Sequence, residues 1–317
     1  LSSRTNVYWF ILDSYSRNDL LSEGFNFDNS NFIKFLKSKD FIIAKNSYSN
    51  YENTMRSISS TLNMNYYLPV NKTLNAGMWT NKLQGFNNVT KNFKEIGYKF
   101  YRAENGHYNL KLRCGGLEDW CYSGPKKEKK EIFISELETQ FIRLTPLYPI
   151  ISRLNFEFLN IKLTNFDDVI EAIEKKNKEG NFFIFAHLLT PHIPNRFDLD
   201  CKIKKKLDWN LNPLEKNKFH SVYMKPEIKK GYINDIKCLN KQIKKGINDI
   251  MSFDNIDPII IIQSDTGVAI SEEWKVKNEK FKILNAMRLP KNCRNDFYNK
   301  ISSINTFRLV FNCIRSE

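Results

Sequence analysis

The chain has 317 residues, of which 41% are hydrophobic and 14% aromatic, which is enough to bury the core of one large α/β domain. No apolar run approaches the roughly 18 residues that a membrane-spanning helix needs. The net charge of +14 favours anionic partners. However, Lys and Asn are abundant throughout the chain and no nucleic-acid-binding motif is present, so we attribute most of the charge to composition and expect no nucleic-acid partner.

Unbroken apolar runs predict strands that are buried on both faces, as in a parallel sheet, and apolar residues at helical spacing predict helices between them. In chain order, the predicted strands cover residues 6–12, 41–44, 98–101, 181–186, 258–262 and 281–287. The predicted helices cover residues 32–36, 54–64, 87–96, 166–176, 232–251 and 304–313. This alternation predicts a single α/β domain over residues 1–317, with a mostly parallel central sheet flanked by helices on both faces. Prolines interrupt a helical pattern over residues 131–163, so we expect a helical lid or insert at about residues 110–165.

The six cysteines include no pair at metal-binding or redox-motif spacing. Their even number favours disulfides and an extracytoplasmic location, periplasmic or membrane-attached, with Cys114–Cys121 as the first pair to expect. The alternative is six free thiols in a cytosolic protein. The chain starts at Leu1 without a Met, so we expect a processed or excised fragment, and membrane association through a missing upstream segment stays open.

Polar side chains follow three of the predicted strands. Asp13 follows the first strand, His192 lies in the loop after the fourth, and Asp265 follows the fifth. Strand ends in a parallel sheet share one edge, where ligands of open α/β sheets bind, so these groups are expected to converge. Two carboxylates and an imidazole suit one divalent cation, Zn or Mn. The alternative for Asp265 is a carboxylate that only caps the next segment.

Thr54 stands at the start of a predicted helix, after a polar loop. Unpaired N–H groups and the positive end of the helix dipole make such a position a ready anion site. A metal ion beside the hydroxyl would lower its pKa and make it a nucleophile. The alternative is that Thr54 is an ordinary N-cap.

Five segments, in order along nearly the whole chain, resemble those of sulfatase-like members of the alkaline phosphatase superfamily. They resemble, in turn, that family's opening strand, nucleophile segment, substrate-histidine loop, strand-Ser-Asp-His-Gly motif and C-terminal helix. Here they are residues 6–13, 49–54 with 57–66, 185–192, 259–267 and 304–308.

The resemblance implies one divalent metal ion held by Asp13, Thr54, Asp265 and Thr266. It further implies that Thr54 attacks phosphorus, forms a covalent phospho-threonine and passes the group to water or to an acceptor alcohol. By the same resemblance, His192 contacts the transferred phosphoryl group or its acceptor.

Two residues depart from the sulfatase pattern. Thr54 cannot form the aldehyde that arylsulfatases make from Cys or Ser, so the chain looks more like phosphoethanolamine and phosphoglycerol transferases, which use threonine. Thr266 replaces the family's histidine, and a hydroxyl is a poor zinc ligand, so weak metal binding is expected. His107 is the one remote candidate to fill the gap left by that histidine, although a surface-loop position is the alternative we favour for it. Of the other histidines, we expect His187 to be buried behind the ligands and His220 to be exposed.

These features predict a metal-dependent phosphotransferase or phosphodiesterase that acts on an anionic, phosphate-containing substrate, an extracytoplasmic glycan or lipid head group. The alternative is a degenerate relative that binds an anionic ligand without turnover, as Thr266 suggests. A third hypothesis is a basic surface-binding module, whose binding would be sensitive to salt and indifferent to Thr54.

Overall fold

A computed structural model gives the fold. It describes residues 5–66, 76–104, 114–124, 132–134, 145–146, 159–161, 164–176, 181–204, 223, 225–254, 256–271, 273 and 275–315. Within these ranges, none of the helices combines the length and the apolar character that crossing a bilayer requires.

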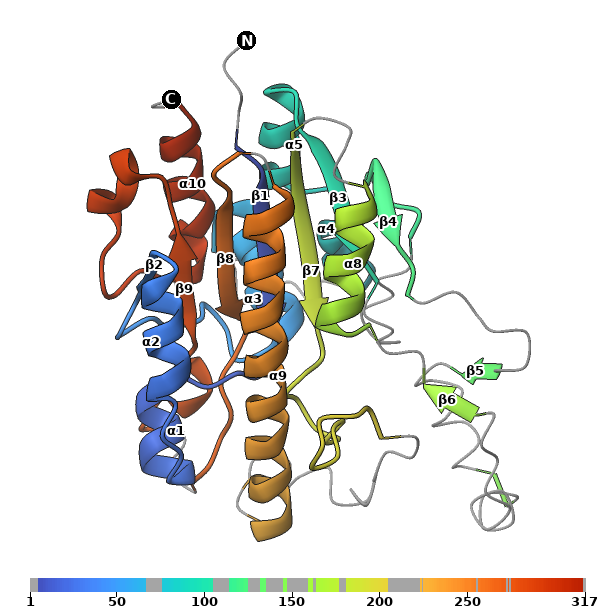
Figure 1. The fold of residues 1–317 in the computed structure, drawn as a ribbon, viewed down its shortest axis with the longest axis vertical. Coiled ribbons are helices and arrows are strands. Elements are labelled where there is room, and N and C mark those ends of the chain that lie inside the picture. Colours follow the sequence, from blue (N-terminus) through green and yellow to red (C-terminus); the bar gives the residue numbers. More distant parts are fainter. Residues whose placement is uncertain are drawn as a thin grey trace.

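A seven-stranded sheet forms the centre of the molecule, with the strand order β2-β9-β8-β1-β7-β3-β4 (Figure 1). Only the pairings of β9 with β8 and with β2 are antiparallel, which confirms the predicted mostly parallel sheet. In chain order the strands are β1 (Val7–Leu12), β2 (Phe41–Ile43), β3 (Lys99–Ala103), β4 (Trp120–Tyr122), β7 (Phe182–Leu188), β8 (Ile259–Ser264) and β9 (Asn285–Arg288). Two further strands, β5 (Ile132–Ile134) and β6 (Leu159–Ile161), pair in parallel with each other.

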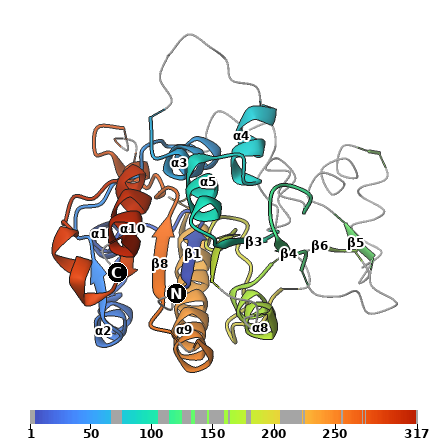
Figure 2. The ribbon, with the colours of Figure 1, turned by 90° about the horizontal axis from the view of Figure 1, so that it is seen from above.

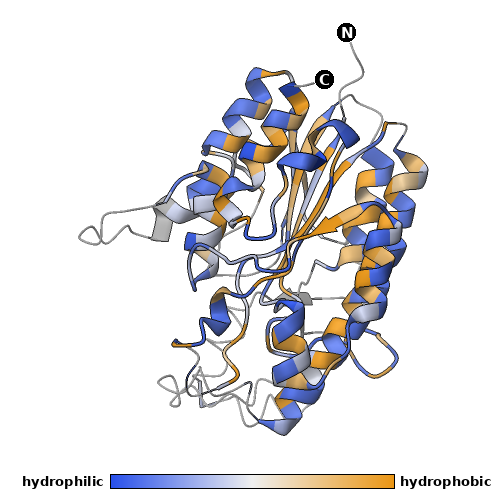
Figure 3. Cartoon of the chain, turned by 90° about the vertical axis from the view of Figure 1, so that its left-hand side faces the viewer, coloured by the Kyte–Doolittle hydropathy of each residue, from blue (hydrophilic) through white to orange (hydrophobic). Residues whose placement is uncertain are grey.

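Helices cover both faces of the sheet (Figure 2). One face carries α1 (Asn18–Phe25), α2 (Ser30–Ser38), α8 (Phe166–Lys176) and α9 (Pro226–Phe253). The other carries α3 (Thr54–Asn63), α4 (Ala76–Leu83), α5 (Asn88–Glu95) and α10 (Thr306–Arg315). Short 3-10 helices follow at η2 (Glu279–Phe281), η3 (Lys291–Asp296) and η4 (Ser303–Asn305). The helices are amphipathic, and the hydropathy colouring of Figure 3 shows the sheet as an apolar layer between them.

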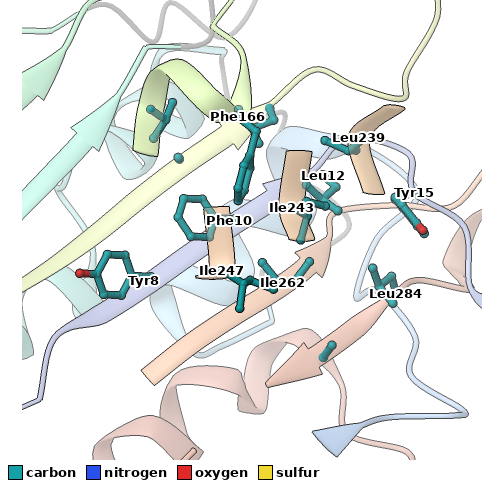
Figure 4. Packing of buried hydrophobic residues seen from close by; sticks show 14 of the residues in the cluster. Tyr8, Phe10, Leu12, Tyr15, Phe166, Leu239, Ile243, Ile247, Ile262 and Leu284 are labelled. Carbon is teal, nitrogen blue, oxygen red and sulfur yellow. The ribbon is translucent and has the colours of Figure 1, made fainter. Parts of the chain in front are cut away.

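The apolar and polar residues of a half-exposed strand alternate, but those of β1 do not, because both of its faces are buried. Tyr8, Phe10 and Leu12 point into the core beneath α8 and α9, and Figure 4 shows Phe10 packed near Phe166. The intervening residues point into the second core, beneath α3, α5 and α10. Because both faces of the strand are covered, every position of β1 must be apolar.

The structure corrects several predicted boundaries. Helices α1 and α4 were not predicted, and α9 begins at Pro226, a residue suited to the first turn of a helix, rather than at residue 232. The predicted strand 281–287 is shorter in the structure. It begins only at Asn285, as β9, and the short 3-10 helix η2 overlaps the start of the predicted range. Within the predicted insert at about 110–165, the described parts contain the strands β4, β5 and β6. The remainder of that insert lies outside the described residues, so a helical lid stays a prediction.

All six cysteines form disulfides, Cys114–Cys121, Cys201–Cys238 and Cys293–Cys313. The predicted pair is therefore confirmed and the alternative of free thiols is wrong. Disulfides persist in oxidising compartments, so this pattern is consistent with a location outside the cytoplasm.

Candidate active site

Three neighbouring strands, β1, β7 and β8, run in parallel and end at the same edge of the sheet (Figure 1). In the register of the sheet, Ile11 of β1 stands beside His187 of β7, and Asp13 and Asp265 lie just beyond the ends of β1 and β8. Side chains alternate between faces, so positions 11 and 13 point to the same side. Ligand atoms of Asp13, His187 and Asp265 lie within 4.8 Å of one another, and all three residues are buried.

The turn after β1 links the two carboxylates. Ser14 has a φ of 65°, in the left-handed region that is uncommon for a residue other than glycine. Its N–H donates to Asp265 Oδ1 at 3.1 Å, and its hydroxyl donates to Asp13 Oδ1 at 3.0 Å. From the opposite face, the Tyr232 hydroxyl of α9 donates to the Ser14 carbonyl at 2.8 Å. These contacts hold the turn in a conformation that brings the two carboxylates together.

Thr54 is the first residue of α3, and Asn53 is the N-cap, because the Asn53 side chain accepts a hydrogen bond from the Arg56 N–H. The alternative in which Thr54 is itself the cap is therefore wrong. Burial raises the pKa of Asp265, and a hydrogen bond from the Thr54 hydroxyl opposes that rise. Ser57, one turn further along α3, donates to the Asp265 carbonyl at 2.7 Å and ties the helix to this strand end. The structure thus places Thr54 beside Asp265, at the positive end of a helix.

The charge balance of the cluster favours a bound cation. Burial raises the pKa of Asp265, and the negative charge of Asp13 raises it further, while His187, Thr54 and Ser14 act in the opposite direction. Asp265 Oδ2 is buried and has no well-formed hydrogen bond to any residue that the structure describes. A buried carboxylate oxygen without a donor is costly, and a cation removes that cost. The residues therefore fit the divalent metal ion that the sequence predicts.

His192 lies in the loop after β7, five residues beyond His187, and is partly exposed. Its Nδ1 is 2.6 Å from the Ile193 carbonyl oxygen, which can only accept, so Nδ1 carries a proton and Nε2 is the nitrogen left for chemistry. Asp235 of α9 accepts the N–H groups of Arg196 and Phe197, at 2.8 and 3.0 Å, and so anchors this loop. Within the part of the chain that the structure describes, His192 makes no hydrogen bond or ion pair with the cluster, so its role stays a prediction.

Two residues at the site were not predicted to take part. Sequence analysis expected His187 to be buried behind the ligands, and it is buried, with its Nε2 3.4 Å from Asp13 Oδ2. Its place in register with Ile11, a position that shares a face with Asp13, is the signal that could have found it. The hydroxyl of Tyr223 is 3.4 Å from the Ile193 N–H and interacts with Ser14, and nothing in its surrounding sequence indicates this.

Thr266 is buried next to Asp265, and its role as a ligand stays a prediction. His107 and His220 lie outside the described residues.

The model of the Sulfatase family matches residues 5–297. The chain belongs to the sulfatase family. A comparison with the curated proteins finds no match.

Solved structures from the alkaline phosphatase superfamily share the fold of this chain. The C-terminal periplasmic domain of EcEptC from Escherichia coli, in complex with Zn, has a TM-score of 0.60 at 12% identity, over 99% of this chain and 83% of that one. For the lipoteichoic acid synthase LtaP from Listeria monocytogenes the TM-score is 0.59 at 12% identity, over 99% and 72%. For the soluble domain of lipooligosaccharide phosphoethanolamine transferase A from Neisseria meningitidis it is 0.56 at 13% identity, over 99% and 89%.

Proposed function

We propose that this sulfatase-family protein is a metal-dependent phosphoryl-group transferase or phosphodiesterase with Thr54 as its nucleophile. The observation that carries the proposal is the contact between the Thr54 hydroxyl and Asp265, beside Asp13, at the N-terminus of α3. Sulfate-ester hydrolysis through an aldehyde is disfavoured, because threonine carries a methyl group where the aldehyde must form. Phosphoryl chemistry needs only a hydroxyl nucleophile, a cation and anion-binding donors.

Asp13, Asp265 and Thr54 would hold the divalent cation, Zn or Mn. Such an ion, when bound, neutralises charge on the substrate and lowers the pKa of a hydroxyl next to it. The ten-residue helix α3 begins at Thr54, so the N–H groups of its first turn that Asn53 does not cap can donate to phosphoryl oxygens. Nucleophile and anion site thus lie at the same point.

The reaction proceeds by two displacements. In the first, the Thr54 oxygen bonds to phosphorus, the ester bond of the donor breaks, and the donor's alcohol leaves with a proton. In the second, water or an acceptor alcohol attacks the phospho-threonine, and Thr54 recovers its proton. His192 stands ready on the anchored loop to contact the phosphoryl group or the acceptor, with Nε2 as its reactive nitrogen.

The substrate class that these features favour is a phosphate-containing glycan or lipid head group outside the cytoplasm. The three disulfides support such a compartment. Solved structures with this fold include a phosphoethanolamine transferase and a lipoteichoic acid synthase, and one was solved as a periplasmic domain.

The test is turnover of a p-nitrophenyl phosphodiester with added Zn or Mn, together with mass spectrometry of the peptide that contains Thr54. Thr54→Ala should lower turnover by at least about 1,000-fold and abolish phosphorylation of that peptide. Thr61→Ala, in the same helix, is the matched control and should leave both unchanged. Equal turnover in Thr54→Ala and the unmodified protein would contradict the nucleophile. Ligand binding without any turnover would favour the degenerate relative that Thr266 suggests.

A further inference from the structure

The ligand set carried by the sequence pattern contains no nitrogen. Asp13, Thr54, Asp265 and Thr266 offer only carboxylate and hydroxyl oxygens, which suit Mn or Mg better than Zn. The structure adds an imidazole to this set, because His187 lies with the two aspartates. We propose that His187 Nε2 is a direct ligand of the same cation, an inference that rests on the proposed function. It supplies the nitrogen that Thr266 lacks and makes the site selective for zinc.

The distance between His187 and Asp13 fits two ligands on one metal ion better than a hydrogen-bonded ion pair. Nε2 of His187 and Oδ2 of Asp13 are 3.4 Å apart. A charge-assisted hydrogen bond between nitrogen and oxygen is shorter, about 2.7–2.9 Å. Two ligands on a tetrahedral zinc ion, each about 2.0–2.1 Å from the metal, are separated by about 3.4 Å. The observed spacing is therefore that of two ligands on one ion.

The placement of His187 suits a ligand that must be held rigidly. It lies in β7, a strand with partners on both sides, β1 and β3, and its side chain is buried. Ligands on strands are held more firmly than ligands on loops, so the imidazole needs no rearrangement to meet the ion.

The charges also balance. The two carboxylates, Asp13 and Asp265, carry two negative charges in a buried site. A divalent cation cancels both, and a neutral imidazole adds nitrogen coordination without adding charge. The alternative is that His187 is a positioning residue. In that case its imidazole is protonated and orients Asp13 without contacting the metal.

The experiment measures zinc affinity by competition with a chromophoric chelator, on protein stripped of metal and then titrated. His187→Gln should weaken zinc binding by more than about 100-fold and weaken manganese binding much less. His192→Gln, the other described histidine near the site, is the control and should bind zinc as the unmodified protein does. Adding Thr266→His to His187→Gln should restore most of the zinc affinity, because it returns an imidazole at the residue next to Asp265.

X-ray absorption of the zinc-loaded, unmodified protein gives an independent result that does not depend on a variant that folds. It should show imidazole scattering that persists in His192→Gln. Zinc bound without imidazole, or undiminished zinc affinity in a folded His187→Gln variant, overturns the proposal. If the protein that gives either of these results still shows metal-dependent phosphorylation of Thr54, the proposed function stands and only the assignment of His187 as a ligand fails. If the unmodified protein binds no divalent cation, both fail.

Discussion

Asp235 should make the protein less stable as the pH rises through the weakly acidic range. This carboxyl group lies on α9, is fully buried and anchors the loop that carries His192. Burial raises its pKa from 3.8 to about 6, although the N–H groups of Phe197 and Arg196 and the charges of Arg196 and Lys204 oppose that rise. Replacement by Asn removes the ionisable group and keeps an acceptor of similar shape.

The size of the effect follows from the pKa difference. Between about pH 4 and pH 6 the folded protein holds a proton on Asp235 that the unfolded chain has released, so the free energy of unfolding falls as the pH rises. The contribution is fully present below the unfolded pKa of 3.8 and is lost above the folded pKa of about 6. That difference in pKa corresponds to about 3 kcal/mol.

Urea denaturation of the unmodified protein and of Asp235→Asn, at a series of pH values, checks this prediction. The stability of the variant relative to the unmodified protein should increase by about 3 kcal/mol between about pH 3 and pH 7. Asp249→Asn, on the same helix but partly exposed, controls for the effect of the substitution on the helix itself. A relative stability that is constant with pH, or that falls as the pH rises, would refute the reasoning.

Two further predictions concern a closely packed glycine and a buried ion pair. Gly246→Ala should lower the melting temperature, because the new Cβ would lie 2.4 Å from Phe166 Cε1, and overpacking of about 1–3 kcal/mol outweighs the gain of about 1 kcal/mol in helix propensity. Gly231→Ala should cost less, although its Cβ would lie 1.8 Å from Asn195 Nδ2, because Asn195 is partly exposed and its side chain can rotate aside; an equal loss in both would contradict this reasoning. Glu118→Ala should lower the free energy of unfolding by about 3 kcal/mol, because it removes the carboxylate paired at 3.1 Å with the buried Arg102; an unchanged urea midpoint would argue against this.

Much of the candidate site could be predicted because it depends on strand ends. The apolar runs of β1 and β8 are buried on both faces, so the sequence indicates central parallel strands and the edge at which they end. Asp13 and Asp265 follow those strands directly, so the sequence placed both at one edge of the sheet, and the adjacency of β1 and β8 brings them together. Thr54 was found for a similar local reason, since a polar loop followed by apolar residues at helical spacing indicates a helix start.

Local patterns were enough to predict most of the strands, their polar ends, the start of α3, and the short-range disulfide Cys114–Cys121, whose two cysteines are seven residues apart. The folded chain was needed to show which strands are neighbours, which distant cysteines pair, that Asn53 caps α3, and that His187 lies beside Asp13 and Asp265. Periodicity shows which residues are buried, whereas the partners of a buried side chain depend on the order and register in which distant strands pair. His187 was correctly expected to be buried, but its distance from Asp13 is set by the pairing of β7 with β1, across more than 170 intervening residues.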